Sequence, residues 1–117
     1  MALIIQDFRR SLPRATWSIG KRRGKPRYAT LHYNGPAVKN RTPAGERAQL
    51  IFDAGYHMGP YLGADGLQYH AAGLSDGTVL QCRDWDAILW HCGNEDGNEL
   101  SISYHLPLGG NQDATLS

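Results

Sequence analysis

The sequence lacks long apolar stretches, and no basic cluster precedes its first apolar residues. The apolar run at residues 2–5 is followed at once by Gln6 and Asp7. A run this short falls below the length of a signal-peptide core or a membrane-spanning helix. We therefore expect a protein without an export signal of its own and without a membrane span.

Cysteine is also scarce, because Cys82 and Cys92 are the only two residues of this kind. Their spacing is not the CxxC of redox and metal motifs. A disulfide between them would need an oxidising compartment, and nothing in the sequence marks export. The sequence therefore favours two free thiols in a reducing compartment.

Internal repeats, linkers and low-complexity segments are absent from the 117 residues, which favours a single domain over 1–117. Hydrophobic residues make up 41% of the chain, as in a globular protein. Residues 1–41 hold ten Lys or Arg and one acid (net +9), whereas 42–117 hold two Arg and ten acids (net −8). This split indicates an anionic partner for the first half or, more simply, two halves that neutralise each other in the fold.

The first part of the chain, residues 1–27, is expected to be a basic arm ahead of a core at 28–117. Residues 3–5 suit a brief strand, and 9–27 combine basic residues with Pro and Gly, which is typical of a loop. The core then begins with a β-branched and aromatic run at 28–33, which predicts a strand.

Thr42 and Pro43 predict the start of a helix, with Thr42 as its N-cap. Gly59 followed by Pro60 predicts the end of this helix. Apolar residues recur at helical spacing between these signals, which predicts an amphipathic helix of about four turns. The residues expected on its apolar side are Ala44, Ala48, Ile51 and Gly55, with Leu50, Ala54 and Met58 beside them.

An Asp-Gly turn between the strand-like runs 67–73 and 78–82 predicts a β-hairpin. Residues 84–91 suit a helical turn running into a loop, and 94–99 suit a polar loop. Residues 100–106 alternate apolar and polar side chains, as a strand does. One long helix and several strands, partly in hairpins, predict an α+β fold with a central mixed β-sheet flanked by helices.

Five histidines are present, and none is paired at HxxxH spacing. His32 and His105 stand out because each lies near the end of an expected strand, on the face of the small polar residues. Two such strands side by side could bring both imidazoles to one point. A catalytic zinc takes three protein ligands and a water whose pKa it lowers to about 7. The commoner alternative is that each histidine is an ordinary surface or hydrogen-bonded core residue.

Several short motifs follow one another in the order and spacing of one enzyme family. They are the strand at 28–32 that ends in a histidine, the GxxYH-like 66–70, the rDGtvyq-like 75–81, the WHaGn-like 90–94 and the NxxSIgI-like 98–103. Each motif is weak alone, but the order agrees over residues 28–115. The chain therefore resembles the zinc-dependent N-acetylmuramoyl-L-alanine amidases, a family that includes phage endolysins and peptidoglycan recognition proteins.

The resemblance implies hydrolysis of the amide between N-acetylmuramic acid and L-alanine through a zinc-bound water. It implies that His32 is the first zinc ligand and that Tyr69 is the active-site tyrosine, which orients the water or stabilises the oxyanion. An endolysin of this kind would stay in the cytoplasm until its release to the cell wall. The residues that would bind substrate are Trp90, His91, Asn94 and Asn98.

The family supplies two further zinc ligands from a later segment, and the sequence has no counterpart of them. We therefore expect a C-terminally truncated member of the family: a fragment, one half of a split enzyme, or a protein with a different site. In the last case His105 or Cys92 would join His32 at the metal. A missing last helix would also uncover an apolar sheet face, which favours self-association or a complementing chain.

Two other functions stay open at this point. The same fold without zinc and turnover would be a non-catalytic muropeptide-binding module. The basic segment 9–27 suits nucleic acid electrostatically, but Trp17 is its only aromatic residue and no recognition motif is present. Bacterial peptidoglycan is therefore the expected partner.

Overall fold

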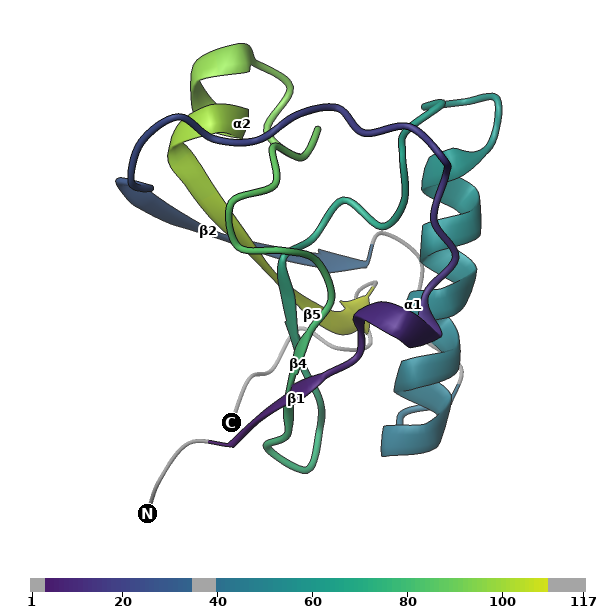
Figure 1. Cartoon of the computed structure of the whole chain (residues 1–117). Coiled ribbons are helices and arrows are strands. Elements are labelled where there is room, and N and C mark those ends of the chain that lie inside the picture. Colours follow the sequence, from purple (N-terminus) through teal and green to yellow (C-terminus); the bar gives the residue numbers. More distant parts are fainter. Residues whose placement is uncertain (1–3, 35–39, 110–117) are drawn as a thin grey trace.

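The computed structural model describes residues 4–34 and 40–109. Within them the strands form one five-stranded sheet of order β1-β4-β3-β5-β2 (Figure 1). Strands β3 and β4 are antiparallel, and the other neighbours are parallel. This mixed sheet with flanking helices confirms the predicted fold class. The elements are β1 (Ile5–Asp7), η1 (Arg9–Ser11), β2 (Tyr28–Asn34), α1 (Pro43–Met58), β3 (Ala71–Gly73), β4 (Val79–Gln81), α2 (Glu95–Leu100) and β5 (Ser101–Gly109).

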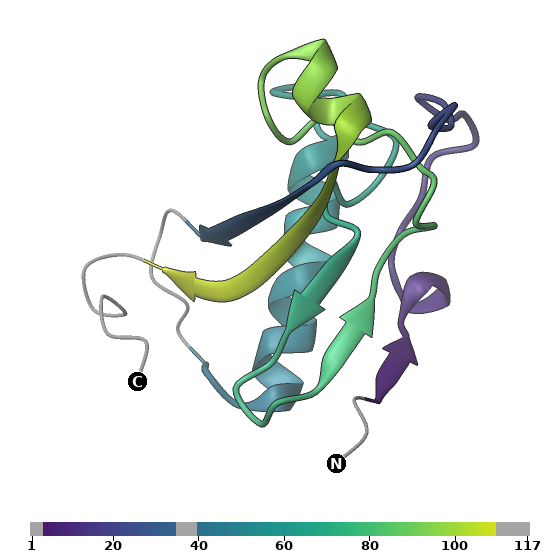
Figure 2. The same ribbon diagram turned by 90° about the vertical axis from the view of Figure 1, so that its left-hand side faces the viewer.

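Helix α1 lies across one face of the sheet (Figure 2) and begins where the sequence predicted. The Oγ1 atom of Thr42 accepts a hydrogen bond from the Gly45 amide at 3.1 Å, so Thr42 is the N-cap. Leu50 and Ala54 are fully buried, as is Glu46. The Glu46 carboxylate accepts hydrogen bonds from the amide and hydroxyl of Ser75, at 3.1 and 2.8 Å.

The predicted apolar side of this helix was only partly right, because Leu50 and Ala54 are buried as expected but the four residues at its centre are not. Ala44, Ala48, Ile51 and Gly55 are exposed, and the buried side is that of Glu46, Leu50 and Ala54. The sequence pattern misled because it treats a glutamate as an outward-facing residue. Here Ser75 donates two hydrogen bonds to Oε1 of that carboxylate, whereas its Oε2 is buried without a partner among the described residues.

The hairpin of β3 and β4 confirms the Asp-Gly turn signal, with Gly77 at φ 87°, a conformation that favours glycine. The expected loop at 94–99 was wrong, because α2 forms there. Its N-cap is Asn94, whose Oδ1 accepts a hydrogen bond from the Gly97 amide at 2.7 Å. The segment contains Asp96, Gly97 and Asn98, which have low helix propensity, so the sequence did not indicate this short helix. The cap at Asn94 stabilises it.

The expected basic arm is folded onto the rest of the molecule. Strand β1, two residues later than expected, pairs with β4 at the edge of the sheet. Arg22 donates to the backbone carbonyls of Trp85, Glu99 and Ser101 at 2.8, 2.8 and 3.1 Å. Arg9 bonds to Asp84, which lies in the acidic half of the chain. These contacts agree with the simpler interpretation, in which the two halves neutralise each other.

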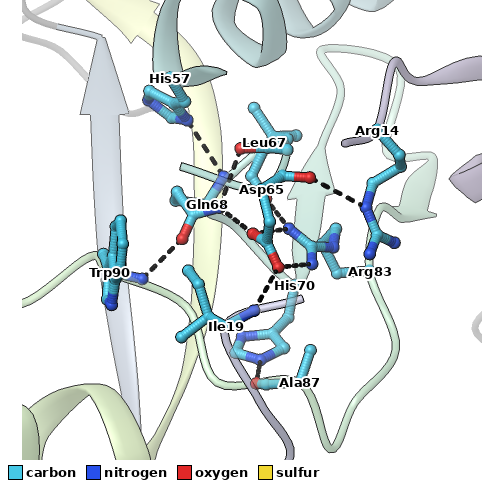
Figure 3. A network of polar contacts seen from close by, with 11 residues as sticks. Arg14, Ile19, His57, Asp65, Leu67, Gln68, His70, Arg83, Ala87 and Trp90 are labelled. Carbon is cyan, nitrogen blue, oxygen red and sulfur yellow. Dashed lines mark hydrogen bonds and ion pairs between the residues drawn. The ribbon is translucent and has the colours of Figure 1, made fainter. Parts of the chain in front are cut away.

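The core contains a buried ion pair as well as apolar side chains. Asp65 and Arg83 have side chains that are each 1% exposed, and they form two hydrogen bonds of 3.1 and 3.0 Å (Figure 3). Cys82 and Cys92 are both free, as the sequence predicted. The buried apolar cluster consists of Leu12, Leu50, Ala54, Leu67, Ala72, Leu74, Leu80 and Cys82.

Strand β2 lies at the other edge of the sheet, and its two faces differ. Thr30, His32 and Asn34 point to the more buried side. Leu31 and Tyr33 point the other way and are 59% and 71% exposed. Two apolar side chains of this edge strand are thus exposed. None of the helices in the described ranges is long and apolar enough to cross a membrane.

Candidate functional site

Strands β2 and β5 bring two histidines together. They are parallel neighbours with His32 opposite His105 in the register. Because opposite residues of paired strands point to the same face, both imidazoles lie on one side of the sheet. The structure therefore places His105 beside His32, where the sequence hypothesis put it. The role of either residue in holding a metal stays a prediction.

His105 is fully buried and neutral. Its Nε2 atom donates to Oδ1 of Asn34 at 2.6 Å and lies 3.8 Å from Oδ2 of Asp53 on α1. Burial, together with the neighbouring His32 and His57, lowers the pKa of His105 to about 3. Its ring stacks on Tyr69 with centroids 4.1 Å apart and planes at 5°.

Tyr69 stands in the middle of a group of histidines. Its ring centroid lies 4.1 Å from that of His105, 5.4 Å from that of His32 and 5.3 Å from that of His57. Burial, together with the charge of Asp53, raises the pKa of Tyr69 to about 12. The phenol therefore keeps its proton at neutral pH and can donate a hydrogen bond.

The loop before α2 adds His91 and Cys92 to this group. The Nδ1 atom of His91 lies 2.9 Å from Nε2 of His32, and its Nε2 lies 3.0 Å from Oγ of Ser101. The Cys92 sulfur is 3.2 Å from Nδ1 and 3.8 Å from Nε2 of His91. These similar distances place the sulfur over the face of the ring and not along a nitrogen lone pair. Burial lowers the pKa of His91 to about 4 and also lowers that of His32.

Two predicted substrate-binding residues hold this loop in place. Oδ1 of Asn98 accepts hydrogen bonds from the amides of His91 and Cys92, at 2.9 and 2.8 Å. Asn94 caps α2 and is exposed. Trp90 is 39% exposed, and its ring centroid lies 6.2 Å from that of Trp17, which is 46% exposed. Contacts of the substrate with Trp90, His91, Asn94 and Asn98 stay predictions.

Buried Gln68 connects the ion pair of the core to the site (Figure 3). Its Oε1 accepts from the Trp90 amide at 2.7 Å, and its Nε2 donates to Asp65 at 2.9 Å. The backbone amide of Gln68 donates to Nδ1 of His57 at 3.0 Å. Sequence reasoning missed His57, Gln68 and Trp17, because each is defined by contacts between distant segments. For Gln68, the one signal in the sequence was its position directly before the tyrosine of the GxxYH-like motif.

The residues described do not fit a catalytic zinc centre. No group of three or more His, Cys, Asp or Glu within 4–34 and 40–109 could hold a metal ion. Three protein ligands are the usual minimum for catalytic zinc. Nε2 of His32 bonds to His91, and Nε2 of His105 bonds to Asn34. Nε2 of each of these two histidines is therefore occupied, and the two residues offer only part of a zinc ligand set.

The fold is shared with peptidoglycan recognition proteins of known structure. Bumblebee PGRP-SA is 24% identical with a TM-score of 0.72, covering 94% of this chain and 62% of its own. Wild-type Drosophila PGRP-LB is 18% identical with a TM-score of 0.76, covering 98% and 65%. A point mutant of PGRP-LB in complex with tracheal cytotoxin is 18% identical with a TM-score of 0.75, covering 96% and 63%.

The sequence itself places the chain in a family. The family model described as N-acetylmuramoyl-L-alanine amidase matches residues 22–112, and the chain belongs to this family. Comparison with curated protein sequences finds no match. The chain spans less than two-thirds of the length of the solved relatives cited above, at 62 to 65%.

Proposed function

We propose that this protein acts on bacterial peptidoglycan as an N-acetylmuramoyl-L-alanine amidase. The observation that supports this proposal is the contact of Tyr69 with His32, whose ring centroids lie 5.4 Å apart. A protonated phenol and a neutral imidazole at one spot suit an amide, which needs a hydrogen-bond donor at its carbonyl oxygen. Membership in the amidase family supports the choice of substrate.

The phenol of Tyr69 would donate to the carbonyl oxygen of the amide between the lactyl group of N-acetylmuramic acid and L-alanine. Negative charge develops on this oxygen during attack, so the hydrogen bond strengthens toward the transition state. A pKa of about 12 keeps the donor proton in place across the neutral range. Stacking on His105 holds the ring of Tyr69, because the planes of the two rings are nearly parallel, at 5° to each other.

A zinc ion remains part of the proposed activity. When bound, it would supply an activated water. His32 would provide one imidazole, so the other ligands have to come from elsewhere than the described residues.

A muropeptide-binding module without turnover is the second candidate. Two observations favour it: the incomplete ligand set, and the engagement of Nε2 of His32 with His91 at 2.9 Å. Solved relatives include two bound to tracheal cytotoxin, which for one of them, peptidoglycan recognition protein-LE, is described as monomeric diaminopimelic acid-type peptidoglycan. The two candidates share a ligand and differ in turnover.

The glycan part of the substrate would lie against Trp17 and Trp90. Both rings are partly exposed, and their planes are tilted by 48° at a distance of 6.2 Å. Exposed indole faces offer an apolar surface to the C–H groups of a pyranose ring. Trp90 directly precedes His91, which bonds to His32, so a sugar there would adjoin the amide.

Cosedimentation with insoluble peptidoglycan, followed by an assay for newly formed L-alanine amino groups with and without added zinc, tests both candidates. An amidase binds and releases amino groups, and Tyr69→Phe slows release by about 100-fold or more while binding persists. Binding without release would support the module. A wild-type protein that does not bind would refute the proposed function altogether.

A further inference from the structure

The hydrogen bonds of the histidines determine which ring nitrogens carry protons. In neutral histidine one nitrogen donates and the other accepts. Nδ1 of His57 accepts from the Gln68 amide, so its proton lies on Nε2. Nδ1 of His70 accepts from the Ser103 amide at 3.0 Å, and its Nε2 donates to the carbonyl of Ala87 at 2.7 Å. Neither ring keeps a free lone pair.

The ring of His91 belongs to a chain of hydrogen bonds with one direction. The hydroxyl of Ser101 donates to the carbonyl of Gly97, so its oxygen can only accept from His91. Nε2 of His91 therefore carries the proton, and its Nδ1 is an acceptor. The nitrogen 2.9 Å from this acceptor, Nε2 of His32, must then be the donor.

The opposite direction is physically unfavourable. If Nδ1 of His91 donated to His32, the hydroxyl of Ser101 would have to donate to Nε2 of His91. No proton would then lie between the Ser101 oxygen and the Gly97 carbonyl, although these atoms are at hydrogen-bonding distance. Two facing oxygen lone pairs repel each other, so this arrangement is disfavoured.

One accessible basic nitrogen remains in the group. With its proton on Nε2, His32 has a lone pair on Nδ1, and residues 4–34 and 40–109 give this atom no hydrogen-bond partner. The other unengaged nitrogen lone pair is Nδ1 of His105, which is buried. Nδ1 of His32 does not belong to the buried unpartnered atoms, and the residue is only half-buried.

We propose that His91 is a positioning residue for His32. By accepting the Nε2 proton, it keeps the ring of His32 in one orientation and one tautomer. Nδ1 then stays the nitrogen that faces an incoming ligand. His91 acts through a chain that ends on the backbone of α2, so the helix fixes the direction of every hydrogen bond in it. The identity of the ligand rests on the proposed function, whereas the tautomer does not.

Nitrogen-15 NMR of the ring nitrogens in the unmodified protein, without ligand and near pH 8, tests this assignment. We expect Nε2 of His32 at a protonated shift and Nδ1 at an unprotonated one. We also expect a scalar coupling across the hydrogen bond from His32 Nε2 to His91 Nδ1. A protonated Nδ1 on His32, or no coupling, would overturn the proposal, and neither result depends on peptidoglycan binding.

Two variants separate the acceptor from the bulk of the ring. His91→Phe keeps an aromatic ring but no acceptor, so the two shifts of His32 should move toward each other as both tautomers become populated. His91→Asn places an amide oxygen near the position of Nδ1 and should keep the single tautomer. His70 is the internal control, because its partners are Ala87 and Ser103 and its shifts should not change. Unchanged His32 shifts in His91→Phe would sink the positioning role.

Discussion

Replacing Arg83 with methionine would leave the carboxylate of Asp65 buried without its cation. The two side chains are each 1% exposed and share two hydrogen bonds of 3.1 and 3.0 Å. Burial raises the pKa of Asp65, but hydrogen bonds from Arg83, Ile19 and Gln68 outweigh it and keep the pKa below its ordinary value. The variant loses the strongest of these donors.

Breaking a buried ion pair from one side costs about 3–5 kcal/mol of unfolding free energy. The whole domain is expected to have roughly 5–15 kcal/mol, so the variant should be close to unfolding. At about 4 °C per kcal/mol, Tm should fall by roughly 10–20 °C. Urea unfolding followed by tryptophan fluorescence at pH 7 measures the loss directly.

The pH dependence and a second substitution identify the cause. In the native protein the pair stabilises the fold above the unfolded pKa of Asp65, and this contribution is lost as pH falls through the folded pKa. The gap in unfolding free energy between native protein and Arg83→Met should therefore narrow as the pH falls below 3.8, toward the lowered folded pKa of Asp65. Adding Asp65→Asn, which removes the buried charge but keeps one acceptor, should restore more than about 1 kcal/mol.

Arg9→Met is the matched control. Arg9 also pairs with carboxylates, those of Asp7 and Asp84, but its side chain is 40% exposed. An exposed pair of this kind contributes little to stability, because water screens the two charges. If Arg83→Met and Arg9→Met lose the same free energy, the reasoning from burial is refuted.

Three further predictions follow from the structure. Trp17→Ala and Trp90→Ala should each weaken cosedimentation with peptidoglycan about fivefold or more. Trp85→Ala is the control, because Trp85 is also partly exposed, at 38%, and its loss should not weaken binding. Equal effects of all three variants would exclude a glycan site on Trp17 and Trp90. Burial lowers the pKa of His70 to about 4 from an unfolded value of about 6.5, so the unfolded chain takes up the proton first as the pH falls. The urea concentration at the unfolding midpoint should therefore be lower at pH 5 than at pH 7. An unchanged midpoint would contradict this. Leu31→Lys should reduce self-association through the exposed face of β2, measured by sedimentation velocity, and a native protein that is already monomeric at high concentration would refute it.

Local chemistry was enough to predict several elements. The cap at Thr42 and the stop at Gly59 depend on neighbouring residues, so the bounds of α1 could be read along the chain. The Asp-Gly turn specified the hairpin of β3 and β4 in the same way. Strand β2 was recognisable because its β-branched and aromatic residues suit an extended backbone.

Contacts between distant segments decided the rest. The buried side of α1 depends on Ser75, which lies 29 residues from Glu46, and the chemistry of Nε2 of His32 depends on His91, which lies 59 residues away. The sequence by itself determined the family, the mixed sheet and the candidates His32, Tyr69 and His91. Only the tertiary structure decided which nitrogens are occupied and that the basic segment is docked. The physical reason is that hydrogen-bond direction and burial depend on partners that only folding brings within reach.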